Sequence, residues 1–240
     1  MIEIRHIDPD DLHEAYNALY HDRSLQHEDD YYYWLVSLLD PVPGRRLLDV
    51  SCGEGALLEW ARRAGLHAWG ADISDRALTV AHAQAPQAHP VASDAQRLPF
   101  PDGAFDYVTN IGSLEHYADP QQGAQEMARV LAPDGRAVVL LPNTFGLLWN
   151  IRHVRRTGDV YDDGQPIQRY GTRKQWERLL SRNGLHVDQV LPYNKARPRN
   201  RRGWLRYARH PLGLLISLAI WHLIPVNLAN CLVFICSRRP

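Results

Sequence analysis

The chain has 240 residues, of which 45% are hydrophobic and 22% are charged, and its formal net charge at pH 7 is zero. This length and composition are typical of one globular domain with a full core, or of one domain with an elaboration, and they exclude a wholly disordered chain. Three cysteines (Cys52, Cys231 and Cys236) are too few for a disulfide framework, which favours a reducing cytoplasm.

The first residues and the histidines narrow the class of protein further. The opening stretch MIEIRHIDPDD has neither the basic start nor the apolar core of a signal peptide, so we expect a cytoplasmic protein. The 12 histidines are scattered, and no pair of them has the spacing of metal ligands on a helix. We therefore expect no metal site.

Short apolar segments alternate with helical patterns, which predicts an α/β fold with a mostly parallel sheet, helices on both faces and an antiparallel last strand. The expected helices include Ala56–Arg63 and Arg173–Arg182, the second capped by Thr172, and a third helix starts at Asp119-Pro120. We expect a turn at residues 133–135 (Pro-Asp-Gly). Seven strands are expected, at Arg46–Val50, His67–Ala71, His89–Ala92, Phe105–Asn110, Arg136–Leu141, Leu185–Val190 and Leu232–Ser237.

Two long segments interrupt this alternation, at residues 143–171 and at residues 192–230. Connections of this length are usually functional lids or binding elements. We accordingly divide the chain into an N-terminal helical cap (1–44), a core (45–191), a basic and then apolar insertion (192–230), and a last strand with its tail (231–240).

The stretch LLDVSCGEG at residues 47–55 is the most informative part of the sequence. A strand there turns through a loop of small residues directly into the helix at Ala56–Arg63. Such a turn brings backbone N–H groups and the positive end of the helix toward a ligand. An anionic or nucleotide-like ligand is therefore expected at this loop. The same pattern also occurs in plain tight turns.

Further motifs follow this loop in order, and together they resemble those of the class I S-adenosylmethionine-dependent methyltransferases, in particular the methyltransferase-11-like members. The resemblance covers roughly residues 45–190 and implies a Rossmann-like seven-stranded sheet with S-adenosylmethionine as the cofactor. The matching motifs are LDVSCGEG (48–55), GADIS (70–74), DA (94–95), LPF (98–100), FD (105–106), LEH (114–116), DP (119–120) and VLAPDGR (130–136).

The resemblance assigns roles to acids at three strand ends. Asp72 would accept both ribose hydroxyls, as acids do at this place in nucleotide-binding sheets. Asp94 would accept the adenine amino group, and Asp49 would hold the methionine end together with the loop amides. The remaining cofactor-binding residues that we expect are Ser51, Gly53, Gly55, Ile73, Ala95, Asn110 and Ile111.

Two observations keep other interpretations open. Family members usually have glycine at the position of Ser51, so loss of the cofactor is one alternative. The acids could also be simple caps and turn residues. A dinucleotide-binding dehydrogenase is less well supported, because its G-x-G-x-x-G pattern needs glycines at 51, 53 and 56, and only Gly53 is present.

His116 is the candidate catalytic base, because it follows the fourth strand of the core and an unperturbed imidazole titrates near neutral pH. It could equally serve to hold its loop. We favour oxygen as the acceptor atom on account of this histidine. The resemblance implies that the aromatic stretch between Tyr16 and Trp34 closes over the cofactor, with Tyr20 or Tyr31 lining the pocket. For about half of these aromatic residues we instead expect packing of a helix against the sheet.

The segment at residues 195–224 combines seven Lys or Arg with Trp204 and Tyr207, and then continues into an apolar run. That run has 13 residues between Pro211 and Pro225, whereas a membrane span needs about 20. This pattern suits a helix that lies in the interface of an anionic membrane. A core helix or a dimer contact fits equally well, and nucleic acid is not an expected partner.

The sequence thus predicts an S-adenosylmethionine-dependent methyltransferase that acts on a small-molecule or lipid-linked acceptor, in the cytoplasm or at the inner face of the membrane. Transfer to carbon or nitrogen of a soluble metabolite is one alternative. A non-catalytic interaction subunit with the same fold is another.

Overall fold

The computed structural model describes residues 1–8, 11–22, 24–194, 204–205 and 211–239. All seven Lys and Arg residues of the basic stretch at 195–210, and Tyr207, lie outside the described residues.

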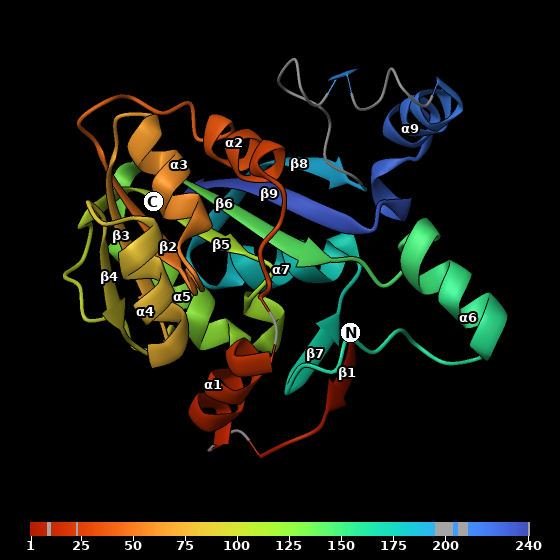
Figure 1. The fold of residues 1–240 in the computed structure, drawn as a ribbon, viewed down its shortest axis with the longest axis horizontal. Helices are drawn as coiled ribbons and strands as arrows, with labels where there is room; N and C mark the ends of the chain where they lie inside the picture. The colour runs from red at the N-terminus through yellow and green to blue at the C-terminus, as the bar shows by residue number, and fades with distance from the viewer. Residues whose placement is uncertain (9–10, 23, 195–203, 206–210, 240) are drawn as a thin grey trace.

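A seven-stranded sheet forms the centre of the molecule, with strand order β4-β3-β2-β5-β6-β9-β8 (Figure 1). The last strand, β9, pairs antiparallel with both of its neighbours, whereas β2 pairs parallel with β3 and β5. This confirms the predicted fold class. The strands are β2 (Arg46–Val50), β3 (His67–Asp72), β4 (His89–Ala92), β5 (Phe105–Ile111), β6 (Leu131–Pro142), β8 (Leu185–Tyr193) and β9 (Cys231–Arg238).

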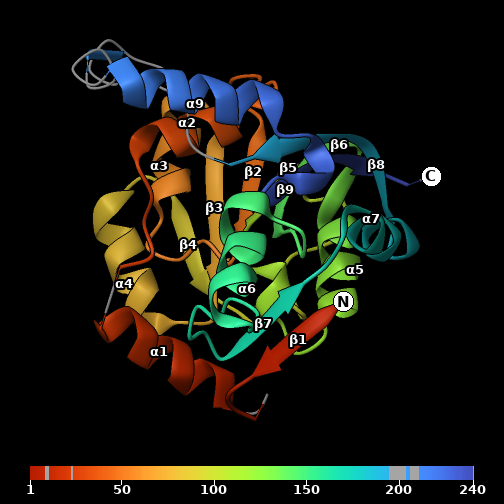
Figure 2. The ribbon, with the colours of Figure 1, turned by 90° about the vertical axis from the view of Figure 1, so that its right-hand side faces the viewer.

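Helices cover both faces of this sheet, because successive side chains of a strand point to opposite faces. Leu47 packs in a core cluster with α2 (Asp29–Ser37), α3 (Ala56–Arg63) and α4 (Asp75–Gln84). The next residue, Leu48, packs in a second cluster with α5 (Pro120–Val130) and α7 (Arg173–Arg182). Figure 2 shows the sheet between these two groups of helices.

Local capping fixes the starts of two helices where the sequence predicted them. The Asp119 side chain accepts hydrogen bonds from the backbone N–H groups of Gln121 and Gln122, with Pro120 in the first turn of α5. Thr172 and Gln175 form a capping box at the start of α7.

Residues 133–135, where the sequence predicted a turn, lie within the bounds of β6 but leave its regular pairing. Phe105 pairs with Leu131 and Tyr107 pairs with Arg136, so residues 132–135 form an irregularity opposite Asp106. A bulge of this kind bends the strand without ending it.

A small second sheet was not predicted from the sequence. In it β1 (Ile2–Arg5) pairs antiparallel with β7 (Ile167–Tyr170). Figure 2 shows these two segments, which are far apart in the sequence, side by side below α6 (Arg152–Thr157). The remaining elements are α1 (Leu12–Asp22) in the N-terminal part, η2 (Leu114–His116) after β5, and η3 (Leu147–Ile151) in the segment at 143–171.

The apolar run before the last strand forms α9 (Pro211–Leu223), followed by η4 (Val226–Leu228). Leu215 and Leu223 of this helix are exposed. Within the described part of the chain, no helix has both the length and the apolar character needed to cross a bilayer.

Candidate functional site

A cavity of about 530 Å³ lies at the carboxyl ends of β2, β3 and β5, the edge at which ligands bind in open α/β sheets. Its walls come from the loops after these strands, from α1 and α2, and from the segment at 143–171. Figure 1 shows the carboxyl end of β6 directed toward the small sheet and α6, which border the same region. The cavity therefore has the place and the size of a cofactor and acceptor site.

The glycine-containing loop after β2 is held tightly by its neighbours. Ser51 and Cys52 both donate backbone hydrogen bonds to the carbonyl of Ala71, at 2.7 and 3.0 Å. Ser51 has a φ of 62°, a left-handed conformation that is uncommon for a residue other than glycine. Its Oγ shares a 2.7 Å hydrogen bond with the hydroxyl of Tyr117. This bond gives Ser51 a partner that the usual glycine could not have.

Asp49 lies at the base of the cavity with 4% of its surface exposed. Thr109 donates a 2.7 Å hydrogen bond to its Oδ1. Burial raises the pKa of the Asp49 carboxyl to about 7, against the opposing effect of the Thr109 hydrogen bond. A cationic group bound beside it would favour the ionised form, so Asp49 suits the ammonium of an amino acid moiety.

Asp72 connects two loops at the carboxyl end of β3. Its Oδ2 accepts a 2.7 Å hydrogen bond from the backbone of Gly53, and its Oδ1 accepts a 2.9 Å bond from the backbone of Ser74. Burial raises the pKa of this carboxyl, and the backbone hydrogen bonds oppose that shift. A carboxylate has about four acceptor positions, so Asp72 can still accept the hydroxyls of a ribose.

Asp94 and Ala95 line the cavity beyond the end of β4. The backbone of Gln96 donates a 2.9 Å hydrogen bond to Asp94 Oδ1, and the Gln96 side chain donates to both carboxyl oxygens. An adenine amino group at Asp94 would thus take the place of an amide donor that is already present. Ile73 and Ile111 also line the cavity.

Gly55 and Asn110 are not among the described residues that line the cavity. Gly55 precedes α3 with a φ of 83°, and a Cβ at this position would lie 2.9 Å from the Cβ of Ala81. Asn110 donates to the carbonyl of Val50 at 3.0 Å and to the Tyr117 hydroxyl at 2.7 Å. Both residues hold the loops around the cavity in position.

His116 lines the cavity from η2 and is 5% exposed. Its Nδ1 donates a hydrogen bond to the carbonyl of Ile167. Burial lowers the pKa of the His116 imidazole, although the hydrogen bond to Ile167 and the charge of Asp163 oppose this, and the shift favours the neutral ring. In a neutral ring with the proton on Nδ1, the Nε2 atom carries a free lone pair. The geometry therefore gives His116 the tautomer that a base requires.

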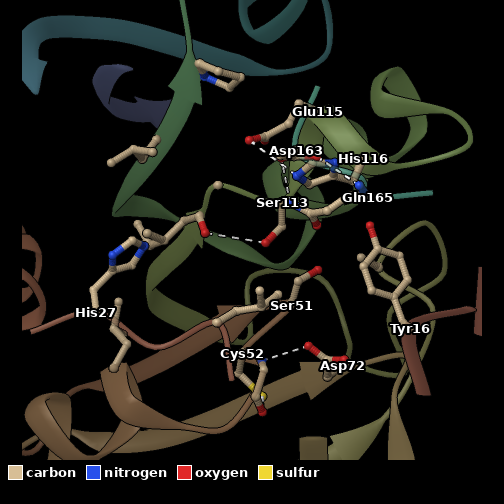
Figure 3. Close-up of a pocket in the computed structure, with 18 of the residues that line it drawn as sticks. Tyr16, His27, Ser51, Cys52, Asp72, Ser113, Glu115, His116, Asp163 and Gln165 are labelled. Atoms are coloured by element: carbon tan, nitrogen blue, oxygen red, sulfur yellow. Dashed lines mark hydrogen bonds and ion pairs between the residues drawn. The ribbon is translucent and has the colours of Figure 1, made fainter. Parts of the chain in front are cut away.

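Several residues of the cavity had no assigned role in the sequence. Glu115 lines it with 4% of its surface exposed, and its Oε1 lies 3.8 Å from His116 Nε2. Burial raises the pKa of Glu115 to about 8, with a further contribution from the charge of Asp163. Figure 3 shows Glu115, His116 and Asp163 grouped at one end of the site, with Cys52 and Asp72 at the other and Ser51 between.

The signals for these residues differ. Glu115 directly precedes His116 in the motif LEH (114–116), so a position of Glu115 near the cavity could have been inferred. Asp163 lies in an irregular part of the segment at 143–171, where no periodicity indicates which way a side chain points.

Aromatic residues close the cavity from the N-terminal side. Tyr20 and Tyr31 both line it, which confirms their predicted position, and Tyr16 and Tyr32 line it as well. Trp34 instead stacks on Tyr193, with ring centroids 5.5 Å apart. Within the described residues, no group of three or more His, Cys, Asp or Glu could hold a metal ion.

Comparisons with known proteins agree with this geometry. Residues 48–139 match the model of a family described as "Methyltransferase domain". The chain is 38% identical to a demethylmenaquinone methyltransferase of Thermus thermophilus over 124 residues. This alignment covers 47% of this chain and 56% of that protein. It is 37% identical over 114 residues to a ubiquinone/menaquinone biosynthesis C-methyltransferase of Laribacter hongkongensis, and this alignment covers 45% of this chain and 46% of that protein. The chain thus spans about half the length of these curated relatives.

A solved structure extends the likeness in fold to most of the chain. An S-adenosylmethionine dependent methyltransferase from Mesorhizobium loti superposes with a TM-score of 0.64 at 17% identity, covering 87% of this chain and 98% of that one. The sheet order, the cavity at its carboxyl edge and the matched domain agree with one another. Residues 48–139 therefore form a methyltransferase domain, and the chain has the fold of the S-adenosylmethionine-dependent methyltransferases.

Proposed function

We propose that this protein transfers a methyl group to a small or lipid-linked acceptor, with oxygen as the preferred atom and His116 as the base. One observation supports this most directly. A single cavity is lined by the acids at three strand ends (Asp49, Asp72 and Asp94) and also by the buried, neutral imidazole of His116. Cofactor-binding residues and a group able to accept a proton therefore line the same space.

The residues that line the cavity at the ends of β2, β3 and β4 fit S-adenosylmethionine. Asp49 would hold the ammonium, Asp72 the ribose hydroxyls and Asp94 the adenine amino group, with Ile73 and Ala95 beside the ring. Backbone groups of loop residues 51–54, which line the cavity, would complete the cofactor site. When bound, S-adenosylmethionine supplies an electrophilic methyl group on a sulfonium.

His116 supplies the proton chemistry in this proposal. The Ile167 carbonyl fixes the proton on Nδ1, so Nε2 can accept the proton of a hydroxyl as its oxygen becomes nucleophilic. The surrounding tyrosines and Trp149 exclude water and orient the acceptor against the methyl group.

The acceptor is proposed to be a phenol or hydroquinone. Two of the relatives are named for methyl transfer in menaquinone or ubiquinone synthesis, and one of these names specifies carbon. Deprotonating a phenol increases the electron density on its oxygen and on the ring carbons ortho and para to that oxygen. The same base would thus serve transfer to oxygen, which we favour, or to carbon, which is the second possibility.

A lipid-linked acceptor is favoured by the mouth of the cavity. Trp149, which lines the cavity, is 48% exposed, and Phe145 nearby in the chain is 53% exposed. Apolar groups of this kind suit an acceptor with an apolar tail.

The proposal also includes contact between the segment at 195–224 and an anionic membrane surface. Sedimentation with vesicles that contain anionic lipid, compared with neutral vesicles, tests that contact.

The first test of the function is a calorimetric titration with S-adenosylmethionine and S-adenosylhomocysteine. We expect micromolar binding of both. Transfer of a labelled methyl group to hydroquinones from a lipid extract is then expected to fall at least about a hundredfold in His116→Gln, with cofactor affinity unchanged. Binding without transfer to any acceptor would favour the non-catalytic interaction subunit, and absence of binding would refute the methyltransferase activity.

A further inference from the structure

Three buried polar atoms line the cavity without a hydrogen-bond partner among the described residues. They are Glu115 Oε2, Gln168 Oε1 and the hydroxyl of Tyr16. Glu115 and Gln168 are only 4% and 3% exposed. A buried polar atom without a partner costs free energy, so native proteins rarely keep such atoms except where a ligand or water satisfies them.

Glu115 lies at the end of the site away from Asp72, and Tyr16 lies between the two ends. Figure 3 shows Glu115 with His116 and Asp163 at the end of the site opposite Asp72, and the ring of Tyr16 directed into the space between. Burial raises the pKa of the Tyr16 hydroxyl, and the nearby charge of Glu115 adds to this effect. Gln168 follows Ile167, whose carbonyl bonds to His116, and it lines the same cavity. Glu115, Tyr16 and Gln168 are therefore placed to meet an acceptor bound beside His116.

The charge of the cavity wall restricts what can bind there. Its described residues include six acids and neither Lys nor Arg, and the acids are Asp49, Glu54, Asp72, Asp94, Glu115 and Asp163. The nearby guanidinium of Arg169 is engaged elsewhere. It donates to the carbonyls of Glu115 and Tyr117 and pairs with Glu3 at 2.7 Å. A carboxylate or phosphate on the acceptor would find no counter-charge among these residues.

We propose that Glu115, the Tyr16 hydroxyl and the Gln168 amide oxygen form an acceptor subsite for an uncharged group that donates a hydrogen bond, such as a phenolic hydroxyl. The subsite binds this group beside His116 Nε2 and rejects anionic groups. The inference rests on the proposed function, because it assigns the acceptor to this end of the cavity.

The chemistry of the three atoms explains this choice. The amide oxygen of Gln168 can only accept hydrogen bonds, so it requires a donor from the ligand. The Glu115 carboxyl and the Tyr16 hydroxyl can both donate and accept. A hydroxyl is able to satisfy such a mixed set, whereas an ether lacks the donor and an anion finds no Lys or Arg among the described lining residues.

Three probes with the same ring system separate these cases. They are 2-naphthol, 2-naphthoate and 2-methoxynaphthalene, each titrated by calorimetry at pH 7 with and without saturating S-adenosylhomocysteine. We expect 2-naphthol to bind at least about tenfold more tightly than either of the others. In Glu115→Leu this preference is expected to disappear, while Glu115→Gln retains it, because an amide keeps both a donor and an acceptor.

Glu54→Gln is the matched control, since the Glu54 side chain also lines the cavity but belongs to the loop after β2. We expect it to keep the preference for 2-naphthol. Equal binding of 2-naphthoate and 2-naphthol would overturn the proposal, as would an unchanged preference in Glu115→Leu. A protein that binds S-adenosylhomocysteine but none of the probes would also refute it. Failure to bind S-adenosylhomocysteine would instead contradict the proposed function, whatever the probes show.

Discussion

Replacing Glu115 by glutamine is expected to change how the stability of the ligand-free protein depends on pH. The pKa of this carboxyl is raised by burial from 4.5 to about 8 in the folded protein. Between these two values the unfolded chain has lost the proton and the folded chain still holds it. Stability from this group is therefore fully present below pH 4.5 and is lost as the pH rises toward 8.

The size of the effect follows from this difference of one proton. Each pH unit in that window lowers the free energy of unfolding by about 1.4 kcal/mol. From pH 5.5 to pH 7.5 the wild-type protein should lose on the order of 2 to 3 kcal/mol through Glu115, whereas the amide side chain of the variant has no proton to lose. The stability advantage of the variant over the wild type should therefore grow by about 2 to 3 kcal/mol between pH 5.5 and pH 7.5.

Urea unfolding, followed by tryptophan fluorescence at pH 5.5, 6.5 and 7.5, measures this difference. The contribution of Asp49, whose pKa is also raised by burial, is common to both proteins and cancels. Glu14→Gln on the exposed side of α1 is the control and should follow the wild type at every pH. Parallel stability curves for the wild type and Glu115→Gln would show that the carboxyl is ionised in the folded protein, and the argument from burial would be refuted.

Three further substitutions test the site and its framework. Asp72→Ala removes the acceptor of two loop N–H groups and of the proposed ribose contacts, and should weaken S-adenosylhomocysteine binding at least about tenfold in calorimetry. Gly55→Ala places a Cβ 2.9 Å from Ala81 at a φ of 83°, which should cost about 2 kcal/mol and lower the Tm by roughly 4–8 °C in a thermal scan. Tyr117→Phe removes a hydroxyl with two buried partners and should lower the free energy of unfolding by about 1–3 kcal/mol in urea. An unchanged affinity in the first variant, or unchanged stability in either of the others, would contradict the corresponding contact.

The sheet could be predicted from the sequence because its signals are local. Strand β2, the small-residue loop and α3 follow one another within 18 residues, from Arg46 to Arg63. Asp49 and Asp72 could be placed for the same reason, since a residue at the end of a parallel strand lies at the ligand-binding edge whatever the rest of the chain does.

The acceptor side could not be predicted in the same way. Its wall depends on β7, which pairs with β1 across more than 160 residues, and neither four-residue strand has a distinctive pattern. The register Ile2↔Tyr170 follows from tertiary packing and not from propensity. Glu115 could be identified as part of a motif, but its missing partner is visible only when all neighbouring elements are in place.

The pairing of β1 with β7 also affects the order in which parts of the structure can form while the chain is being synthesised. As the chain is synthesised, β1 emerges first and has no partner strand until residues 167–170 have followed it. The Ile167 carbonyl that fixes the His116 tautomer, and the Arg169 guanidinium that pairs with Glu3, arrive at the same late moment. The loops around β2 and β3 can form well before this, since their contacts are local. During synthesis the loops around β2 and β3 can thus form early, β1 is paired only when β7 has emerged, and Tyr193 and Cys231 complete the cavity wall later still.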